Sequence, residues 1–210
     1  MRQQRAIIRW LLLLMAPWFA ASGLRAECTA RSGTDTAVLV ELYLPTGCPD
    51  CARAERWLDS LGEIAVALPA GSAEHVSRRK LLVRQKMALT PRPYVLVQGQ
   101  EFPRWDKPDY EHAIARIRAT PAKADLELSI VRVAHAALEV DVHASGTGEL
   151  YVAAYRGNRI LDWEGPFDLR LGRRSLALPP GTGAAATGVV AFVQEPRTRA
   201  VLQALRRRTC

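Results

Sequence analysis

The sequence is constrained most by an apolar run that leads directly into a Cys-x-x-Cys motif and then into a helix-like segment. Residues 37–44 are almost continuously apolar, which is typical of a strand buried on both faces. Cys48 and Cys51 follow closely, and residues 52–61 carry apolar side chains at helical spacing. Two cysteines at a strand-to-helix junction favour dithiol–disulfide chemistry, with a metal-binding pair as the main alternative.

The first 26 residues are typical of an export signal. Three arginines precede an apolar run over residues 10–21, and Ala26 offers a small residue at the cleavage point. This run is shorter than the roughly 20 apolar residues that a membrane-spanning helix needs. An uncleaved membrane anchor is the alternative. We therefore expect a periplasmic or secreted protein with no membrane attachment after residues 1–26 are removed.

Export changes what the charge and the cysteines imply. The formal net charge of the chain is +8, and it falls to +4 without residues 1–26, which hold four arginines and no acid. The cluster at residues 206–208 reads as a solvated end, so we expect no nucleic-acid partner. All four cysteines lie in the exported part, where disulfides form and persist.

The pattern up to residue 120 alternates strands with helices. We expect a strand over 64–68, a helix over 72–89, a proline-led strand over 94–97 that returns as a hairpin, and a final helix capped by Asp106 with Pro108 in its first turn. Together with the run at 37–44 and the helix at 52–61, this is the order of a thioredoxin-like α/β unit. We therefore predict such a domain over residues 27–120.

The pattern changes after a linker-like segment at residues 120–123. Apolar and polar residues now alternate in five stretches, around 126–130, 138–142, 150–154, 167–171 and 189–193, with glycine-rich turns between them. Such period-two alternation predicts an antiparallel sheet or sandwich in which one face of the sheet is exposed to solvent. We predict an antiparallel, β-rich, sandwich-like domain over residues 121–210.

The position of the two cysteines assigns them different roles. Cys48 would lie at the helix start, where free backbone amides and the helix dipole stabilise a thiolate, so it is the predicted nucleophile. Cys51, one turn further, would be the resolving thiol. Asp50 places a negative charge beside Cys48 and works against the thiolate. A permanent structural disulfide stays open as an alternative, as does a metal site, although no second cysteine pair or histidine cluster completes one. We expect no cofactor and no metal.

Several segments along the exported chain also resemble a known family. They are Leu39-Val40-Glu41-Leu42-Tyr43, Gly47-Cys48-x-x-Cys51, Arg56-Trp57-Leu58, the proline-led strand up to Gly99, and Ala191-Phe192-Val193-Gln194. Together they look like secreted bacterial thioredoxin-like proteins of unknown function. The resemblance implies a thioredoxin fold with a β-rich extension and no established substrate. The chain departs from this family at Pro49-Asp50, where serines are usual, and lacks its long histidine- and tryptophan-containing segment before the proline strand.

The wider thioredoxin superfamily implies a cis proline opposite the dithiol, at the start of a strand. Pro93 fits this position because Tyr94 begins the strand at once, whereas Pro91 would start it two residues late. A cis bond costs little only before proline, and proline leaves a neighbouring strand edge open to a substrate. Arg92 would add positive charge near the dithiol. We expect Arg92, Pro49 and Tyr94 to contact the substrate, unless this segment is only a stiff loop.

The same resemblance suggests a role for Glu41. In thioredoxins a buried acid on the corresponding strand, one residue closer to the first cysteine, assists deprotonation of the resolving cysteine. Glu41 is the candidate for this role, and a glutamate satisfied by the backbone or by an arginine is the alternative.

Cys28 and Cys210 are the remaining cysteines, one near each end of the exported chain. An even number of cysteines in an exported protein favours a structural disulfide between them. Free thiols and an intermolecular bridge are the alternatives.

Two functions follow from these features. The first is an exported thiol–disulfide oxidoreductase that acts on cysteine-containing exported proteins or on a redox partner. The second is a non-catalytic binding or assembly protein in which the disulfide between Cys48 and Cys51 is structural.

Overall fold

A computed structural model describes residues 28–69, 91–134, 136–170, 172–182 and 187–210. Its elements are β1 (Cys28–Arg31), β2 (Leu39–Leu44), α1 (Cys51–Asp59), β3 (Ile64–Pro69), β4 (Tyr94–Val97), β5 (Gln100–Glu101), α4 (Asp109–Arg118), β6 (Ala124–Ala134), β7 (Ala137–Gly146), β8 (Glu149–Arg156), β9 (Arg159–Phe167), β10 (Gly172–Ala177), β11 (Thr187–Gln194) and β12 (Val201–Arg208). The predicted signal at residues 1–26 and the predicted helix at 72–89 lie outside the described residues. Within those residues, neither helix has the length and apolarity to cross a bilayer.

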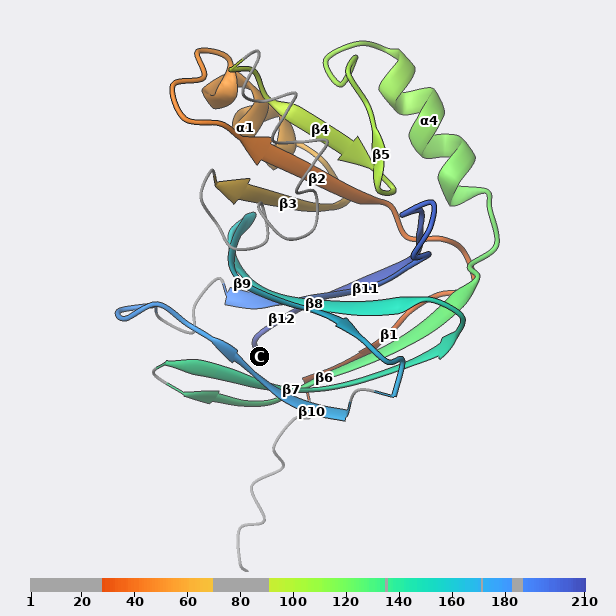
Figure 1. Cartoon of the computed structure of the whole chain (residues 1–210), viewed down its shortest axis with the longest axis vertical. Coiled ribbons are helices and arrows are strands. Elements are labelled where there is room, and N and C mark those ends of the chain that lie inside the picture. The colour runs from red at the N-terminus through yellow and green to blue at the C-terminus, as the bar shows by residue number, and fades with distance from the viewer. Residues whose placement is uncertain (1–27, 70–90, 135, 171, 183–186) are drawn as a thin grey trace, which may run out of the picture.

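The described chain is mostly β-structure in two sheets. One sheet has the strand order β1-β6-β7-β10, and the other has the order β12-β11-β8-β9-β3-β2-β4-β5. Figure 1 shows that the longer sheet bends back on itself between β9 and β3, so that the molecule has four layers. From top to bottom these are the helices, then β2 to β5, then β8, β9, β11 and β12, and last the shorter sheet. The β-rich second half that the sequence predicts is therefore present.

Strand β2 lies in the centre of the first part of the long sheet. It pairs in parallel with β3 and antiparallel with β4, which turns back into β5. Every residue of β2 is buried because the strand has an apolar layer on each face. Val40 and Leu42 pack toward α1 and α4, whereas Leu39 and Tyr43 pack toward β8 and β11. The unbroken apolar run in the sequence is the consequence of this double burial.

The two helices cover one face of β2 and β4. Helix α1 buries Ala54 and Leu58 there, as its predicted spacing requires. Helix α4 starts at Asp109 with Pro108 at the N-cap position, so the prediction that Asp106 caps it is wrong. The Asp106 carboxylate instead accepts a hydrogen bond from Arg53 of α1, at 3.0 Å.

The shorter sheet packs on β8, β9, β11 and β12 through a second apolar core, to which most strands contribute every other residue. The alternation around residues 167–171 does not mark a separate strand, as far as these residues are described. Strand β9 ends at Phe167 and β10 begins at Gly172. Leu169 lies in the connection and packs against the same core, which explains its apolar spacing.

The chain from Val201 to Arg208 forms an edge strand, β12, which the sequence analysis did not predict. Arg208 at its end is exposed, and Arg206 and Arg207 are half-buried. Val201 and Ala204 are buried, and the Arg206 guanidinium lies 4.1 Å from the centroid of the Tyr155 ring. The arginines obscure the strand in the sequence because they stand at positions where the alternation rule expects apolar residues.

Two strand pairings connect the halves of the chain. Strand β1 pairs with β6 and so belongs to the shorter sheet. Strand β3 meets β9 in parallel at Ala67 and Arg159, where the Ala67 N–H donates to the Asn158 carbonyl at 2.6 Å. Arg159 also pairs with Glu55, and the Asn158 amide donates to Asp59, so this turn contacts α1. The two predicted domains thus share one sheet, and the boundary between residues 120 and 121 stays a prediction.

Two buried glutamines join the layers by hydrogen bonds. The Gln203 side-chain oxygen accepts from the Ala37 N–H at 2.9 Å, and its amide donates to the carbonyls of Gly33 and Asp35. The Gln98 oxygen accepts from the Leu39 N–H at 2.6 Å, and its amide donates to the carbonyl at the start of β12. Both side chains satisfy backbone groups that burial would otherwise leave without partners.

Replacing Gln203 with leucine should therefore destabilise the protein. The change keeps the side-chain volume but removes the bonds to the segment before β2, and we expect a loss of about 2–3 kcal/mol. Urea denaturation measures this loss. Gln100→Leu is the control, because Gln100 is exposed and makes a single hydrogen bond, to Thr198. Equal effects of the two changes would show that Gln203 does not hold the layers together.

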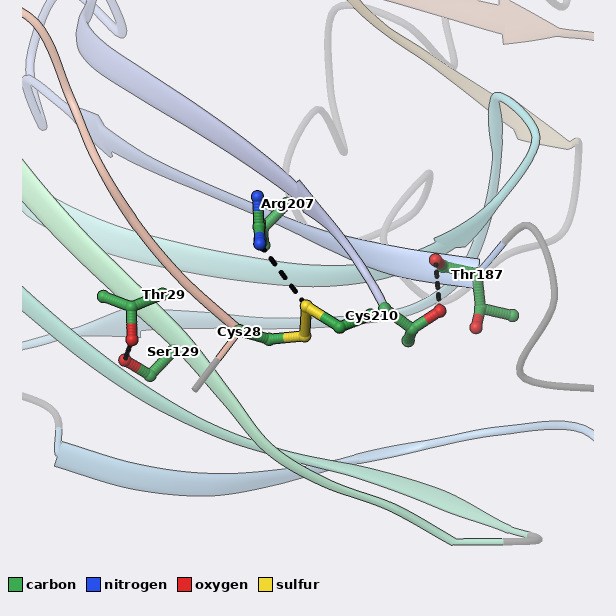
Figure 2. Close-up of a disulfide and its surroundings, with 7 residues drawn as sticks. Cys28, Thr29, Ser129, Thr187, Arg207 and Cys210 are labelled. Carbon is green, nitrogen blue, oxygen red and sulfur yellow. Dashed lines mark hydrogen bonds between the residues drawn. A yellow bond between two sulfur atoms is a disulfide. The ribbon is translucent and has the colours of Figure 1, made fainter. Parts of the chain in front are cut away.

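A disulfide joins the start of β1 to the residue that ends the chain. Cys28 and Cys210 have Cα atoms 5.9 Å apart and are separated by 182 residues in sequence. Figure 2 shows Cys28 on β1 and the Arg207 guanidinium directed at the Cys210 sulfur, 3.3 Å away. Cys28 itself is buried in the core of the sandwich. This is the pairing that the cysteine count favours.

Replacing both Cys28 and Cys210 with serine should lower the free energy of unfolding by about 5 kcal/mol, because the bond closes a very long loop in the unfolded chain. Thermal and urea unfolding without reductant give this value. The matched control is serine at both Cys48 and Cys51, whose bond spans a sequence separation of only 3 and should contribute much less. A larger effect of the control pair would contradict the prediction.

Candidate functional site

The two motif cysteines form a disulfide at the beginning of α1. Their Cα atoms are 5.5 Å apart, and the Cys51 N–H donates to the Cys48 carbonyl at 3.4 Å. Cys51 is the first residue of α1, and Gly47, with a φ of +73°, turns the chain from β2 into the motif. Cys48 is partly exposed, and Pro49 is exposed beside it. The bond therefore lies at the surface, at the positive end of a helix dipole.

A pocket of about 210 Å³ opens beside this disulfide. It brings together Asp50 and Arg53 from the start of α1 with Arg92 and Pro93 from the segment before β4. The structure thus places Asp50 of the motif and the predicted Arg92-Pro93 pair at one pocket, and neither cysteine is among the residues that line it. Arg92 is exposed, Pro93 is buried, and Pro49 does not line the pocket.

Tyr94 also lines this pocket, but its ring belongs largely to the layer behind it. It is 8% exposed and contacts Tyr43 edge-on, with 6.4 Å between the ring centroids. Only a small part of the side chain predicted to contact a substrate is therefore accessible.

The peptide bond before Pro93 is trans, so the expected cis proline is not found there. The cis bond among the described residues precedes Pro166, near the end of β9. For an X–Pro bond the trans isomer is favoured by about 0.5–1 kcal/mol unless the surrounding structure opposes it, and a sequence pattern alone does not supply that opposition.

Glu41 does not lie near the dithiol. It alternates along β2 with Val40 and Leu42, which pack in the same cluster as Cys51, so its side chain points to the opposite face. There it is fully buried and accepts a hydrogen bond from the Tyr43 hydroxyl at 2.8 Å. A position one residue closer to Cys48 would lie on the face of α1, because a shift of one along a strand moves a side chain to the other face.

Arg53 is a site residue that the sequence reasoning missed. Its guanidinium lies 3.4 Å from the Asp50 carboxylate and 3.0 Å from that of Asp106, and its Cζ atom is 5.1 Å from the Trp105 ring centroid. The charge of Asp50, which was expected to oppose a Cys48 thiolate, is therefore offset. The spacing of Asp50 and Arg53, three residues apart on a helix, is the signal that could have identified the pair.

Arg92 adds a positive charge at the pocket. No ion pair or hydrogen bond to its guanidinium occurs within the described parts of the chain. The guanidinium is therefore available to an anionic group of a ligand, whereas Arg53 is already engaged by two carboxylates.

An aromatic cluster lies behind the disulfide. The Trp57 ring is 5.0 Å from Trp105 and 5.1 Å from Tyr110, and Cys51 packs against the same core. Burial raises the pKa of the Tyr110 hydroxyl, and the nearby Glu63 raises it further. Burial therefore favours the protonated hydroxyl, and the Tyr110 ring packs in the aromatic cluster.

The described residues contain no candidate metal site, and the chain has no match among known proteins. In the ranges that the structure describes, no three histidine, cysteine, aspartate or glutamate side chains gather closely enough to hold a metal ion. Comparison with protein-family models, curated proteins and solved structures finds no match to this chain.

The ion pairs of Arg53 predict how reduced Cys48 reacts. Arg53→Gln should slow its alkylation by iodoacetamide at neutral pH about two- to fivefold, and Asp50→Asn should speed it by a similar factor, because exposed ion pairs contribute roughly 0.2–1 kcal/mol and the thiolate is the reactive form. Mass spectrometry of the quenched reaction gives both rates. Arg56→Gln, at an exposed position of the same helix, is the control and should leave the rate unchanged. Changes in the same direction for Arg53→Gln and Asp50→Asn would contradict the charge argument.

Proposed function

We propose that this protein is an exported thiol–disulfide oxidoreductase that acts in the bacterial periplasm or outside the cell. The observation that carries the proposal is the partly exposed disulfide of Cys48 and Cys51 at the start of α1, beside a pocket lined by Asp50, Arg92 and Pro93. Its substrates are cysteine-containing exported proteins or a redox partner protein.

The proposed reaction follows from the order of the two sulfurs. In the reduced protein the Cys48 thiolate attacks one sulfur of a substrate disulfide, which forms a mixed disulfide and releases the other substrate sulfur as a thiolate. Cys51, deprotonated, then attacks the Cys48 sulfur, closes the intramolecular disulfide and releases the second substrate thiolate. The substrate gains two electrons and the protein loses two. The reverse sequence oxidises a substrate dithiol.

Three features of the site support this reaction. The helix start favours the Cys48 thiolate, and Arg53 offsets the opposing charge of Asp50. Cys51 packs against the apolar cluster under α1, as suits a thiol that reacts only with its neighbour. The pocket next to the bond gives room for a substrate segment, with the Arg92 guanidinium at its edge.

The arrangement of the first strands supports a thioredoxin-like unit as part of this proposal. Strand β2 has a parallel neighbour, β3, and an antiparallel neighbour, β4, which continues into β5. Helices α1 and α4 pack on one face of these strands. This order agrees with the α/β unit that the sequence predicts over residues 27–120.

The placement of Glu41 favours a second candidate function. A buried acid next to Cys51 would assist its deprotonation, and Glu41 points to the other face of β2. A binding or assembly protein needs no such acid, and its disulfide would be structural. The reduction potential separates the two functions, because structural disulfides have potentials below about −300 mV and exchanging ones are less negative.

Removing the sulfurs one at a time tests the proposed function. Cys48→Ser should abolish reduction of insulin with dithiothreitol as the electron source, because no nucleophile remains. Cys51→Ser should accumulate a mixed disulfide with insulin, which non-reducing electrophoresis detects.

The control for this experiment is the protein with serine at both Cys28 and Cys210. Those cysteines lie in the sandwich, so this variant should keep its activity at a temperature at which it is folded. Wild-type protein that is inert over a range of redox buffers, with a reduction potential below about −300 mV, would replace the oxidoreductase with the binding function.

A further inference from the structure

A row of three residues crosses the far end of the long sheet, away from the dithiol motif. Tyr155 of β8 lies directly opposite Gly188 of β11, which lies directly opposite Arg208 of β12. Residues directly opposite in an antiparallel ladder share a face, so all three belong to the same side of the sheet.

The glycine allows the tyrosine to reach across this row. A Cβ atom at position 188 would lie 2.5 Å from the Tyr155 hydroxyl oxygen and 2.4 Å from the Arg207 carbonyl oxygen, so a larger residue could not occupy this position without displacement. The phenol therefore lies over Gly188, and its hydroxyl is directed toward the β12 side of the row, where Arg208 is the next residue.

The Tyr155 hydroxyl has no acceptor in this position. Tyr155 is 1% exposed, and no hydrogen bond to its hydroxyl occurs among the residues that the structure describes. A buried hydroxyl without a partner is destabilising, so a group that accepts a hydrogen bond from it would be stabilising.

Two arginines add further donors around the phenol. Arg206 lies over the Tyr155 ring and donates through Nη2 to the Gly157 carbonyl and the Asn158 side chain, but its buried Nε has no acceptor within the described chain. Arg208 is exposed, and no ion pair to it occurs in the same residues. Both arginines therefore retain donor capacity at this position.

Tyr155, Arg206 and Arg208 line one pocket of about 560 Å³. The other lining residues come from the segments that lead into β2 and β3 and from the end of α4. Among the described residues that line the pocket the one acid is Glu63, and its carboxylate is engaged by Arg118, which also lines the pocket. The donors from β8 and β12 therefore meet no free carboxylate among the described lining residues.

We propose that this pocket binds a small oxyanion, a phosphate or carboxylate group, between Arg206 and Arg208 with the Tyr155 hydroxyl as a further donor. An oxyanion supplies several acceptors to a guanidinium and a phenol at once, and charge-assisted hydrogen bonds of this kind are about twice as strong as neutral ones. The site does not depend on the redox function, because its residues come from β8 and β12 and not from the motif.

Titration of the full exported chain with inorganic phosphate, and separately with acetate, tests the site by isothermal calorimetry at constant ionic strength. We expect saturable binding of one equivalent, and the tighter of the two ligands identifies the group that the site prefers. Arg208→Gln should weaken binding roughly tenfold or more, and Tyr155→Phe should weaken it several-fold. Arg173→Gln, an exposed arginine of β10 in the other sheet, removes the same charge and should change nothing.

Urea denaturation of the same variants provides a second measurement. Without an oxyanion, Tyr155→Phe should be at least as stable as the wild type, because it removes a hydroxyl that has no acceptor; with phosphate or acetate the wild type should gain more stability than the variant. Absence of saturable binding of either ion would overturn the proposal. So would equal weakening by Arg173→Gln and Arg208→Gln, or a loss of stability in ligand-free Tyr155→Phe.

Discussion

The apolar layer between the two parts of the bent sheet is the constraint on which the rest of the structure depends. Leu39 and Tyr43 of β2 enter it from one side, and Tyr151 and Phe192 enter it from the other, with their rings stacked at 5.1 Å. Burial of each large apolar side chain contributes roughly 1.5–3 kcal/mol. Because this layer covers the second face of both sheet parts, β2 and β11 are buried on both sides, and a polar group buried there is costly unless it has a partner. Gln98 and Gln203 meet this condition through the backbone.

Local patterns in the sequence predicted most elements but not how they are joined. The double burial of β2 and the helical spacing of α1 follow from residues close in the chain, so the strand, the helix and the hairpin of β4 and β5 could be anticipated. The pairing of β3 with β9 could not be anticipated. It consists of one residue pair, Ala67 with Arg159, and a single pair produces no repeating pattern in the sequence. Strand β12 was missed because arginines occupy positions that the alternation rule assigns to apolar residues.

The candidate site shows the same division. The Cys-x-x-Cys spacing at a strand-to-helix junction is a local signal, and so is the proline that leads β4. Asp50, between the two cysteines, and Pro93 line one pocket. Which face of β2 Glu41 points to changes with a shift of one residue along the strand. Because Glu41 lies between Val40 and Leu42, which pack on the side of Cys51, its own side chain points away from Cys51. The contact of Arg53 with Asp106 joins residues 53 apart in sequence and becomes visible only when α1 and the segment before α4 are placed together.

The bond between Cys28 and Cys210 closes a covalent loop between two residues 182 positions apart in sequence. Cys28 begins β1 and Cys210 follows β12, which contacts β1, and every described helix and strand lies within the stretch that these two cysteines bound. A protease that cuts one exposed loop therefore produces a nicked molecule whose pieces stay covalently joined, with their strands still paired. A cut in the backbone between Cys28 and Cys210 therefore does not separate the molecule into two parts, as long as this disulfide stays oxidised.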